Sequence, residues 1–380
     1  MSHRIIFYPV GNGDTSQIIL SNGRRILFDF RHIKKTGSEN RPEINLKERL
    51  NKELKDAKRD YFDIVAFTHS DSDHIDNSTE FFELRHAKKY QGEGRIKVKT
   101  LWVPAAMILE TATNDDQSSE YVIWRQEARY RLKAGEGIRV FSKPDMLKEW
   151  LKENNISIES VKHLFTDAGQ IVPEFSLDSD GVEFFCHSPF VHHVEDNEEF
   201  RNEAALIFNV RLKAGVRIYN YLAVGDSKWE ILEDIVNITL SKKRADRLMW
   251  DLYNIPHHCS YMALSDEKGE SETVPKEAIK KLLKHGQEGA FLISSSDPIE
   301  DSKQGREQIQ PPHIQAKKCY EHYLSENEGC KLLVTMEEPN KSKPEPIEFV
   351  IDENGIRKKS SNVLSATRQI ISTPAPRAGN

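Results

Sequence analysis

The chain has 380 residues and a formal net charge of −6, and its 38% hydrophobic and 30% charged residues suit a sizeable core under a well-solvated surface. The negative charge excludes a general attraction to nucleic acid, so any such binding has to depend on a local basic patch. No stretch approaches the roughly 18 apolar residues of a membrane span, and the four cysteines show no CxxC spacing. We therefore expect a cytoplasmic protein with reduced thiols and no membrane contact.

The N-terminal part of the chain shows short apolar runs. Strands are expected over residues 4–10, 17–20, 25–30 and 63–68, and a helix over residues 46–58 lies between the third and the fourth. Alternating strands and helices of this length favour a layered α/β fold.

Residues 88–180 are expected to be an insertion with helices over 119–133 and 144–152. The first of these helices mixes aromatic and basic residues, namely Tyr121, Trp124, Arg125, Arg129, Tyr130, Arg131 and Lys133. Such residues can stack on and neutralise a strand of nucleic acid, which would make Arg125 and Arg129 substrate-binding residues. In the alternative interpretation, the rings pack inward and the basic groups are solvated.

A strand-rich pattern follows from residue 182 to about residue 349, and we expect residues 1–352 to form one domain. Residues 353–380 are expected to be a basic, disordered tail, because no acidic residue occurs from Asn354 onward. The basic residues of this tail include Arg357, Lys358, Lys359, Arg368 and Arg377. The tail is a candidate contact for a protein partner.

Four side chains that can bind metal lie within six residues directly after the expected strand 63–68: His69, Asp71, Asp73 and His74. A loop at the end of a buried strand can turn all four toward one point. Imidazole nitrogens and carboxylate oxygens suit zinc, manganese or iron. The alternative is a structural loop in which Asp73 caps a helix that begins near His74.

Three later apolar runs also end in, or precede, candidate ligands. The runs and their residues are 218–224 with Asp226, 248–255 with His257 and His258, and 290–294 with His313. Enzymes of α/β architecture place their chemistry on loops at strand ends. Taken singly, Asp226 is also typical of a turn, the histidine pair of a surface loop, and His313 of the start of a helix.

The order of these motifs resembles the metallo-β-lactamase-fold hydrolases, most closely the hydrolase domain of the bacterial DNA-uptake channel (ComEC-type). The matching segments are Gly11-Asn12-Gly13-Asp14, residues 25–29 ending in Asp29, the hexad 69–74, Gly225-Asp226, residues 256–260 and His313. The hexad reads His-x-Asp-x-Asp-His instead of the commoner His-x-His-x-Asp-His, and Cys259 stands where the family has glycine. The resemblance implies an αββα sandwich over residues 1–352.

The resemblance implies two further candidate site residues. The family has another histidine ligand between the hexad and the Gly-Asp motif, and His187, at the end of an apolar run, is its best counterpart. The alternative for His187 is a buried histidine with a backbone partner. Asn202-Glu203 is similar to a polar pair of that branch, which would place Asn202 near the substrate.

The resemblance implies a dinuclear site for zinc or manganese. The implied ligands are His69 and Asp71 for one ion, Asp73, His74 and either His257 or His258 for the other, and Asp226 as the bridge. Two such ions can share a hydroxide and stabilise an in-line displacement. Asp73, Asp226 or His313 would then transfer protons.

The carboxylate-rich ligand set and the resemblance favour phosphodiester hydrolysis, with DNA, RNA or a cyclic nucleotide as substrate. The same scaffold hydrolyses thioesters, lactones and other small esters, so this class stays open. A third interpretation is a non-catalytic subunit of a complex that contacts nucleic acid. The survival of so many candidate ligands favours an enzyme over that interpretation.

Overall fold

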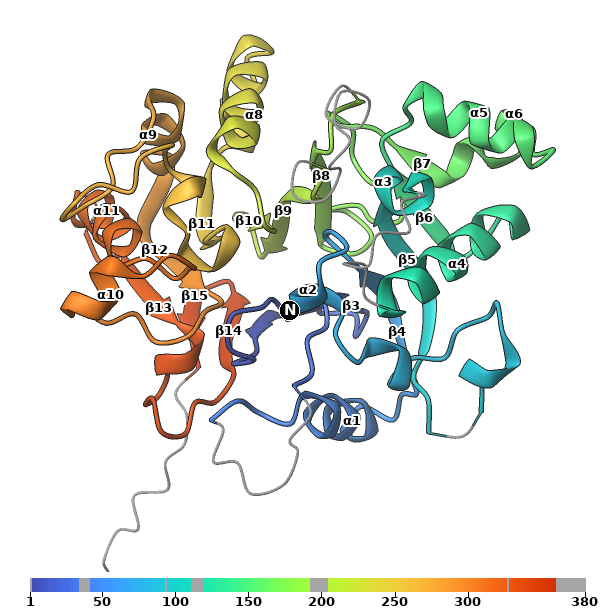
Figure 1. Ribbon diagram of the computed structural model, residues 1–380, viewed down its shortest axis with the longest axis horizontal. Helices are drawn as coiled ribbons and strands as arrows, with labels where there is room; N and C mark the ends of the chain where they lie inside the picture. Colours follow the sequence, from blue (N-terminus) through green and yellow to red (C-terminus); the bar gives the residue numbers. More distant parts are fainter. Residues whose placement is uncertain are drawn as a thin grey trace, which may run out of the picture.

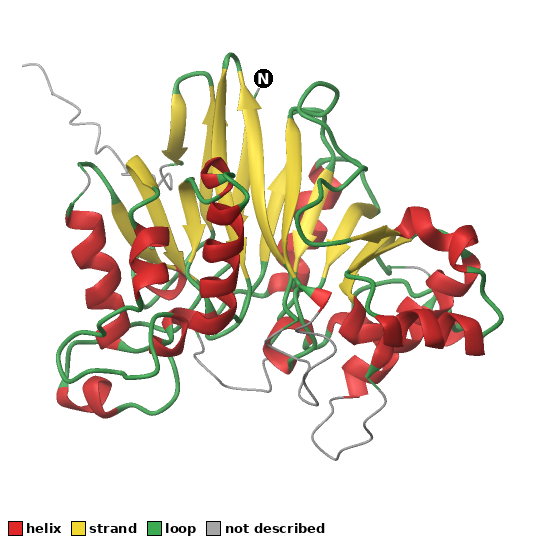
Figure 2. Cartoon of the chain, turned by 90° about the horizontal axis from the view of Figure 1, so that it is seen from above, coloured by secondary structure: helices red, strands yellow, loops and turns green. Residues whose placement is uncertain are grey.

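The computed structural model describes residues 2–33, 42–92, 94–110, 119–191, 204–326 and 328–359. Two β-sheets lie face to face in the middle of the molecule, and helices cover the outer face of each (Figure 2). The αββα sandwich predicted from the sequence is therefore confirmed. Within the described ranges, every helix is too short or too polar to cross a bilayer.

The first sheet has nine strands in the part of the chain described. In spatial order they are β15 (Gly355–Lys358), β14 (Ile347–Asp352), β1 (His3–Phe7), β2 (Ser16–Ile19), β3 (Arg25–Phe28), β4 (Tyr61–Ala66), β5 (Lys97–Pro104), β6 (Ile138–Phe141) and β7 (Phe165–Thr166). The pairs from β15 to β3 are antiparallel, whereas those from β3 to β7 are parallel. The C-terminal ends of β3 and β4 therefore share one edge of the sheet.

The second sheet has six strands among the described residues. In spatial order they are β13 (Lys331–Val334), β12 (Gly286–Ser294), β11 (Trp250–Asn254), β10 (Arg217–Val224), β9 (Ile207–Ala214) and β8 (Val182–Ser188). The strands β10 to β13 are parallel, and β8 and β9 run antiparallel to their neighbours. The ends of β10, β11 and β12 therefore also lie at a common edge.

Helices flank both sheets. They are α1 (Leu46–Asp56), α2 (Ser72–Ile75), α3 (Ala105–Leu109), α4 (Ser119–Ala134), α5 (Asp145–Glu153), α6 (Ile158–Val161), α8 (Trp229–Ser241), α9 (Glu277–Leu283), α10 (Lys303–Glu307) and α11 (Ile314–Ser325). Figure 1 shows α8, α9 and α11 beside the second sheet on the left, and α3, α4 and α5 beside the first sheet on the right.

Successive residues of the central strands face two different cores. Ile64 of β4 packs between the sheets, whereas the next residue, Val65, belongs to the core beneath the helices of the first sheet. Leu46, Leu50 and Leu54 of α1 join that outer core because a spacing of four places them on one helix face. Burying each leucine contributes roughly 1.5–3 kcal/mol. The period-two pattern of the strands thus fixes which residues face each layer.

The structure corrects the predicted insertion and the predicted start of the tail. Residues 88–180 include β5, β6 and β7, which extend the first sheet directly from β4, so they are part of the same sandwich. The tail was expected from residue 353, but β15 pairs antiparallel with β14 through a two-residue turn at Glu353 and Asn354. Residues 360–380 lie outside the described part of the chain.

Candidate metal centre

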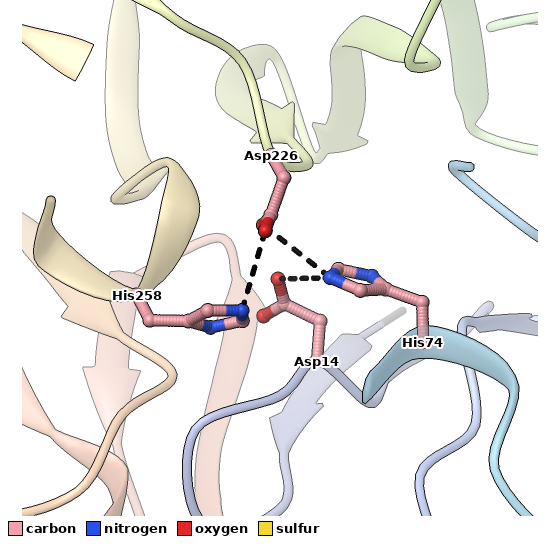
Figure 3. Close-up of side chains that lie close together, drawn as sticks. All are labelled: Asp14, His74, Asp226 and His258. Carbon is pink, nitrogen blue, oxygen red and sulfur yellow. Dashed lines mark ion pairs between the residues drawn. The ribbon is translucent and has the colours of Figure 1, made fainter. Parts of the chain in front are cut away.

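The candidate ligands come from loops at the adjoining edges of the two sheets. Asp14 follows β1, and the hexad occupies the loop after β4 together with α2, which begins directly after Asp71. From the second sheet, Asp226 follows β10, and His257 and His258 follow β11. Segments far apart in sequence therefore meet at one point, as Figure 3 shows for the central residues.

Two glycines allow these loops to approach one another closely. A side chain at Gly13 would place its Cβ 2.7 Å from the carbonyl oxygen of Asp73, and one at Gly225 would lie 2.9 Å from Thr68. Any other residue would push the Asp14 loop away from α2, or the end of β10 away from the end of β4. The Gly-Asp pairs of the sequence thus serve to bring carboxylates into contact with the hexad.

Four buried side chains form the centre of the site: Asp14, His74, Asp226 and His258. One ligand atom from each lies within 4.8 Å of the others. The Nε2 atom of His74 is 3.3 Å from Asp226 Oδ1 and 4.0 Å from Asp14 Oδ2, and His258 Nε2 is 3.4 Å from Asp226 Oδ2 (Figure 3). This mixture of imidazole and carboxylate ligands suits zinc, manganese or iron.

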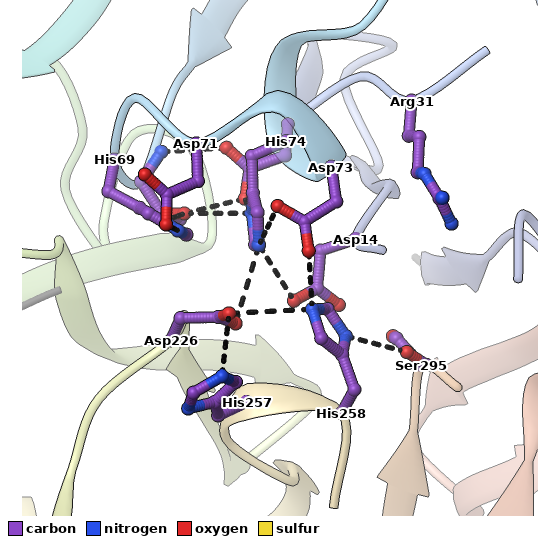
Figure 4. A network of polar contacts seen from close by, with 12 residues as sticks. Asp14, Arg31, His69, Asp71, Asp73, His74, Asp226, His257, His258 and Ser295 are labelled. Atoms are coloured by element: carbon purple, nitrogen blue, oxygen red, sulfur yellow. Dashed lines mark hydrogen bonds and ion pairs between the residues drawn. The ribbon is translucent and has the colours of Figure 1, made fainter. Parts of the chain in front are cut away.

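A second group adjoins the first and consists of His69, Asp73 and His74. Asp73 links the two groups, because its Oδ1 lies 4.0 Å from His74 Nε2 and its Oδ2 lies 3.2 Å from His258 Nε2. His69 Nε2 lies 3.7 Å from Asp71 Oδ2 (Figure 4). This Nε2 is buried and has no hydrogen-bond partner among the described residues, as a free metal ligand requires.

Hydrogen bonds on the far side of each imidazole fix which nitrogen faces the site. His74 Nδ1 donates to Asp29 Oδ2 over 2.8 Å, and Asp29 is itself held by the backbone N–H and the hydroxyl of Thr68. His258 Nδ1 donates to the carbonyl oxygen of Ser295 over 2.9 Å. In the neutral form of each ring, Nε2 faces the centre with its lone pair, which is the arrangement common behind metal-bound histidines.

The sequence left the choice between His257 and His258 open. In the structure His258 belongs to the buried group, whereas the side chain of His257 is 20% exposed and its Nε2 lies 3.7 Å from Asp226 Oδ2. Residues 257–259 have φ values of 49°, 50° and 65°, all in the left-handed region. This backbone explains why a glycine is suited to the position of Cys259, whose side chain here is fully buried.

The carboxylates of the cluster favour the charged forms of two of its histidines. Burial opposes a charge on His74 and on His258, but the nearby carboxylates of Asp29, Asp73 and Asp226 outweigh it and raise the pKa of both histidines well above their usual value. Burial raises the pKa of Asp14 to about 6. Such a concentration of carboxylates around two cationic groups stabilises positive charge, and a divalent cation can supply that charge.

His187 lies elsewhere, which corrects its prediction as a metal ligand. Its neighbour Cys186 faces the core between the sheets, so alternation along β8 turns His187 to the outer face. There its Nε2 donates to the carbonyl oxygen of Arg247 over 3.0 Å. The structure therefore matches the alternative of a buried histidine with a backbone partner.

His313 comes close to the histidine loop, but its ring is engaged by the backbone. Its Nε2 donates to the carbonyl oxygen of Ile309 over 3.0 Å, and its Nδ1 accepts from the N–H of Tyr261 over 3.4 Å. The residue also directly precedes α11. These contacts favour the predicted alternative of a helix start over a group that donates protons to substrate.

The three arginines of α4 are engaged within the fold. Arg125 donates to the carbonyl oxygen of Glu110, Arg129 donates to that of Ile108, and Arg131 forms a buried ion pair with Glu127. The aromatic residues Tyr121 and Trp124 are buried. Asn202, the other predicted substrate contact, lies outside the described residues, as does Glu203.

Sequence reasoning missed Asp14 and Asp29 as members of the site. Both stood in segments that matched the family, since Asp14 ends the Gly-x-Gly-Asp turn and Asp29 ends the third expected strand. The signal was the Gly-x-Gly-Asp turn for Asp14 and, for Asp29, the position at the end of an apolar strand. An isolated aspartate there is also the commonest turn residue, so spacing alone could not separate the two roles.

No protein-family model and no curated protein matches the sequence. Solved structures with a similar course of the chain include yeast PDE1, with 10% identity, 87% of this chain and 97% of that chain covered, and a TM-score of 0.41. The metallo-β-lactamase GOB-18 from Elizabethkingia meningoseptica has 12% identity, 84% and 86% coverage and a TM-score of 0.32. Zn²⁺-bound PqqB from Methylobacterium extorquens has 9% identity, 87% and 97% coverage and a TM-score of 0.31. At such low similarity, function has to be inferred from the residues of the chain itself.

Proposed function

We propose that the protein is a metal-dependent hydrolase that cleaves phosphodiesters with the help of two divalent ions. The observation that carries this proposal is the buried group of Asp14, His74, Asp226 and His258, which joins loops of both sheets at one point. A buried cluster of this composition is costly for a fold unless its charges are compensated. Bound cations would compensate the negative charge of the carboxylates and so offset that cost.

The residues divide into an inner and an outer position. His74, His258, Asp226 and Asp14 would hold the inner ion, with Asp73 within reach of both imidazoles. His69 and Asp71 would hold the outer ion. His74 has only Nε2 available, because Nδ1 is bonded to Asp29, so it serves one ion.

We place Asp226 between the two positions, because its negative charge acts on His69 of the outer position as well as on His74 and His258. Its Oδ1 faces His74, and its Oδ2 faces His258 and His257. Bound divalent ions supply Lewis-acid activation of water and neutralise charge on substrate oxygens. In the protein itself, Asp29 and Ser295 orient His74 and His258. Asp73 is the candidate proton acceptor, since its side chain is 31% exposed and that of Asp226 only 4%.

Two observations support a small phosphodiester as the substrate. Three carboxylates at the inner position favour a hard ion, and a hard ion would in turn bind the oxygens of a phosphodiester. The arginines expected to guide a nucleic-acid strand are bonded to carbonyl oxygens or to Glu127. We therefore place cyclic nucleotides and other small diesters before DNA and RNA, and esters, thioesters and lactones after them.

Hydrolysis of bis(p-nitrophenyl) phosphate by protein loaded with Mn²⁺ or Zn²⁺ tests this function. We expect metal-dependent turnover that Asp226→Asn abolishes and that Asp60→Asn, at an exposed ion pair with Lys97, leaves unchanged. Cyclic nucleotides, single- and double-stranded DNA, RNA and a thioester panel then rank the substrate classes. Turnover of thioesters or lactones in the absence of any diesterase activity would contradict the proposal.

A further inference from the structure

A second cavity lies between the end of β8, the loop around Ala168 and the C-terminal half of α8. Its volume is about 380 Å³. Small-molecule sites typically measure roughly 300–1,000 Å³, so the cavity can take a compact organic ligand. It shares no lining residue with the metal cluster. Its chemistry is therefore independent of the proposed hydrolase activity.

Apolar side chains line one part of this cavity. Phe185 of β8, Phe190 and Ile238 of α8 contribute to its wall. Ile238 remains 37% exposed, so the described residues leave part of its side chain uncovered at the cavity. A flat apolar or aromatic group inserted here would bury Ile238 and contact the two phenylalanines.

Cationic groups line another part. Lys242 and Arg244 follow the end of α8 and border the cavity. The ammonium group of Lys242 has no ion-pair or hydrogen-bond partner among the described residues. Arg244 is 3.5 Å from Asp246, a carboxylate that it shares with Arg211 and Arg247. A cation that no described carboxylate pairs with, at the border of an apolar cavity, favours a ligand with an anionic group.

His187 supplies a hydrogen-bond acceptor in the same wall. The side chain is 3% exposed, and its Nε2 must carry the proton because the carbonyl of Arg247 can only accept. Burial lowers the pKa of His187 to about 4, so the ring is neutral and Nδ1 holds a lone pair. No described donor reaches Nδ1. A ligand with an N–H or O–H group would satisfy it.

We propose that this cavity binds a small aromatic anion that also carries a hydrogen-bond donor. Its ring would lie against Phe185, Phe190 and Ile238, its donor would face His187 Nδ1, and its anionic group would lie at Lys242 and Arg244. Nucleoside monophosphates and hydrogen-bonding aromatic carboxylates share this chemistry. The three recognition elements come from β8, from α8 and from the segment that follows it, so one ligand would connect them.

The fluorescent probe 8-anilinonaphthalene-1-sulfonate combines an aromatic body, an N–H donor and a sulfonate. We expect it to bind the folded protein with one equivalent, and Lys242→Glu to weaken binding about tenfold or more, the scale of one charged hydrogen bond. His187→Phe should also weaken it, because the acceptor is lost. The matched control Lys281→Ala, on the exposed face of α9, should bind the probe like the wild type.

Asp226→Asn separates this site from the metal centre, since it should abolish hydrolysis and leave probe binding unchanged. Competition with 5′-AMP and with indole-3-acetate then distinguishes nucleotides from aromatic carboxylates as the ligand source. The proposal is overturned if the probe does not bind saturably. It is equally overturned if Lys242→Glu and Ile238→Asp, both shown to be folded by circular dichroism, bind the probe like the wild type, or if neither competitor displaces it.

Discussion

Asp29→Asn tests whether the metal centre depends on the carboxylate behind His74. Asp29 accepts three hydrogen bonds, from Thr68 N at 2.7 Å, from Thr68 Oγ1 at 2.6 Å and from His74 Nδ1 at 2.8 Å. Asparagine has nearly the same shape. It also tolerates the left-handed backbone at this residue, where φ is 54°. The substitution therefore changes the hydrogen bonding while the backbone can stay in place.

The amide of asparagine has a single acceptor oxygen. If that oxygen accepts from Thr68 N, the amide N–H groups face His74 Nδ1, which then has to be an acceptor. The ring proton moves to Nε2, the atom that the metal requires. Loss of such a supporting group costs about 10–100-fold in metal affinity, which is about 1.4–2.8 kcal/mol. We expect a loss of this size for the inner ion.

Isothermal titration of Mn²⁺ and Zn²⁺ into metal-free protein measures the change. Asp60→Asn is the matched control, because Asp60 is an exposed carboxylate paired with Lys97 and should bind metal like the wild type. Circular dichroism establishes that both variants are folded. Wild-type affinity in a folded Asp29→Asn protein would refute the role given to Asp29.

Three further substitutions separate ligands from structural residues. Asp14→Asn should weaken the inner ion by about tenfold or more, as measured by titration, because one of its carboxylates is lost; unchanged affinity would remove Asp14 from the ligands. His313→Ala should keep metal affinity but lower the free energy of unfolding in urea by about 1–3 kcal/mol, since Ile309 and Tyr261 lose their partner; a hundredfold loss of kcat at unchanged stability would restore the general-acid role. Arg131→Met should destabilise by about 3–5 kcal/mol, because Glu127 keeps a buried charge; a loss below 1 kcal/mol would show that Glu127 is solvated or protonated.

The elements that sequence analysis placed well are those with strong local patterns. The hexad follows β4 as predicted, because the apolar run that begins at residue 63 is buried on both faces and forms part of a central strand. The leucines at 46, 50 and 54 repeat at a helical spacing, and α1 forms there. In both cases the local preference and the tertiary position agree.

The elements that were missed depend on partners distant in sequence. β15 begins at Gly355 after the two-residue turn at Glu353 and Asn354, whereas the basic composition of this segment had predicted a disordered tail. The strands β5 to β7 join the sheet because β4 provides an edge for parallel pairing. The local sequence of β5 does not indicate that this edge exists. Similarly, Asp14 becomes part of the site only when β1 and β10 bring Asp226 beside it.

The most direct test of the metal centre is anomalous diffraction from crystals of protein loaded with Mn²⁺, measured at the manganese absorption edge. The residues described here predict one strong peak in contact with Asp14, His74, Asp226 and His258, and a second beside His69 and Asp71, about 3.5–4 Å from the first. Asp226→Asn should weaken both peaks. Absence of any peak at these residues in protein that hydrolyses a diester would contradict the proposed mechanism.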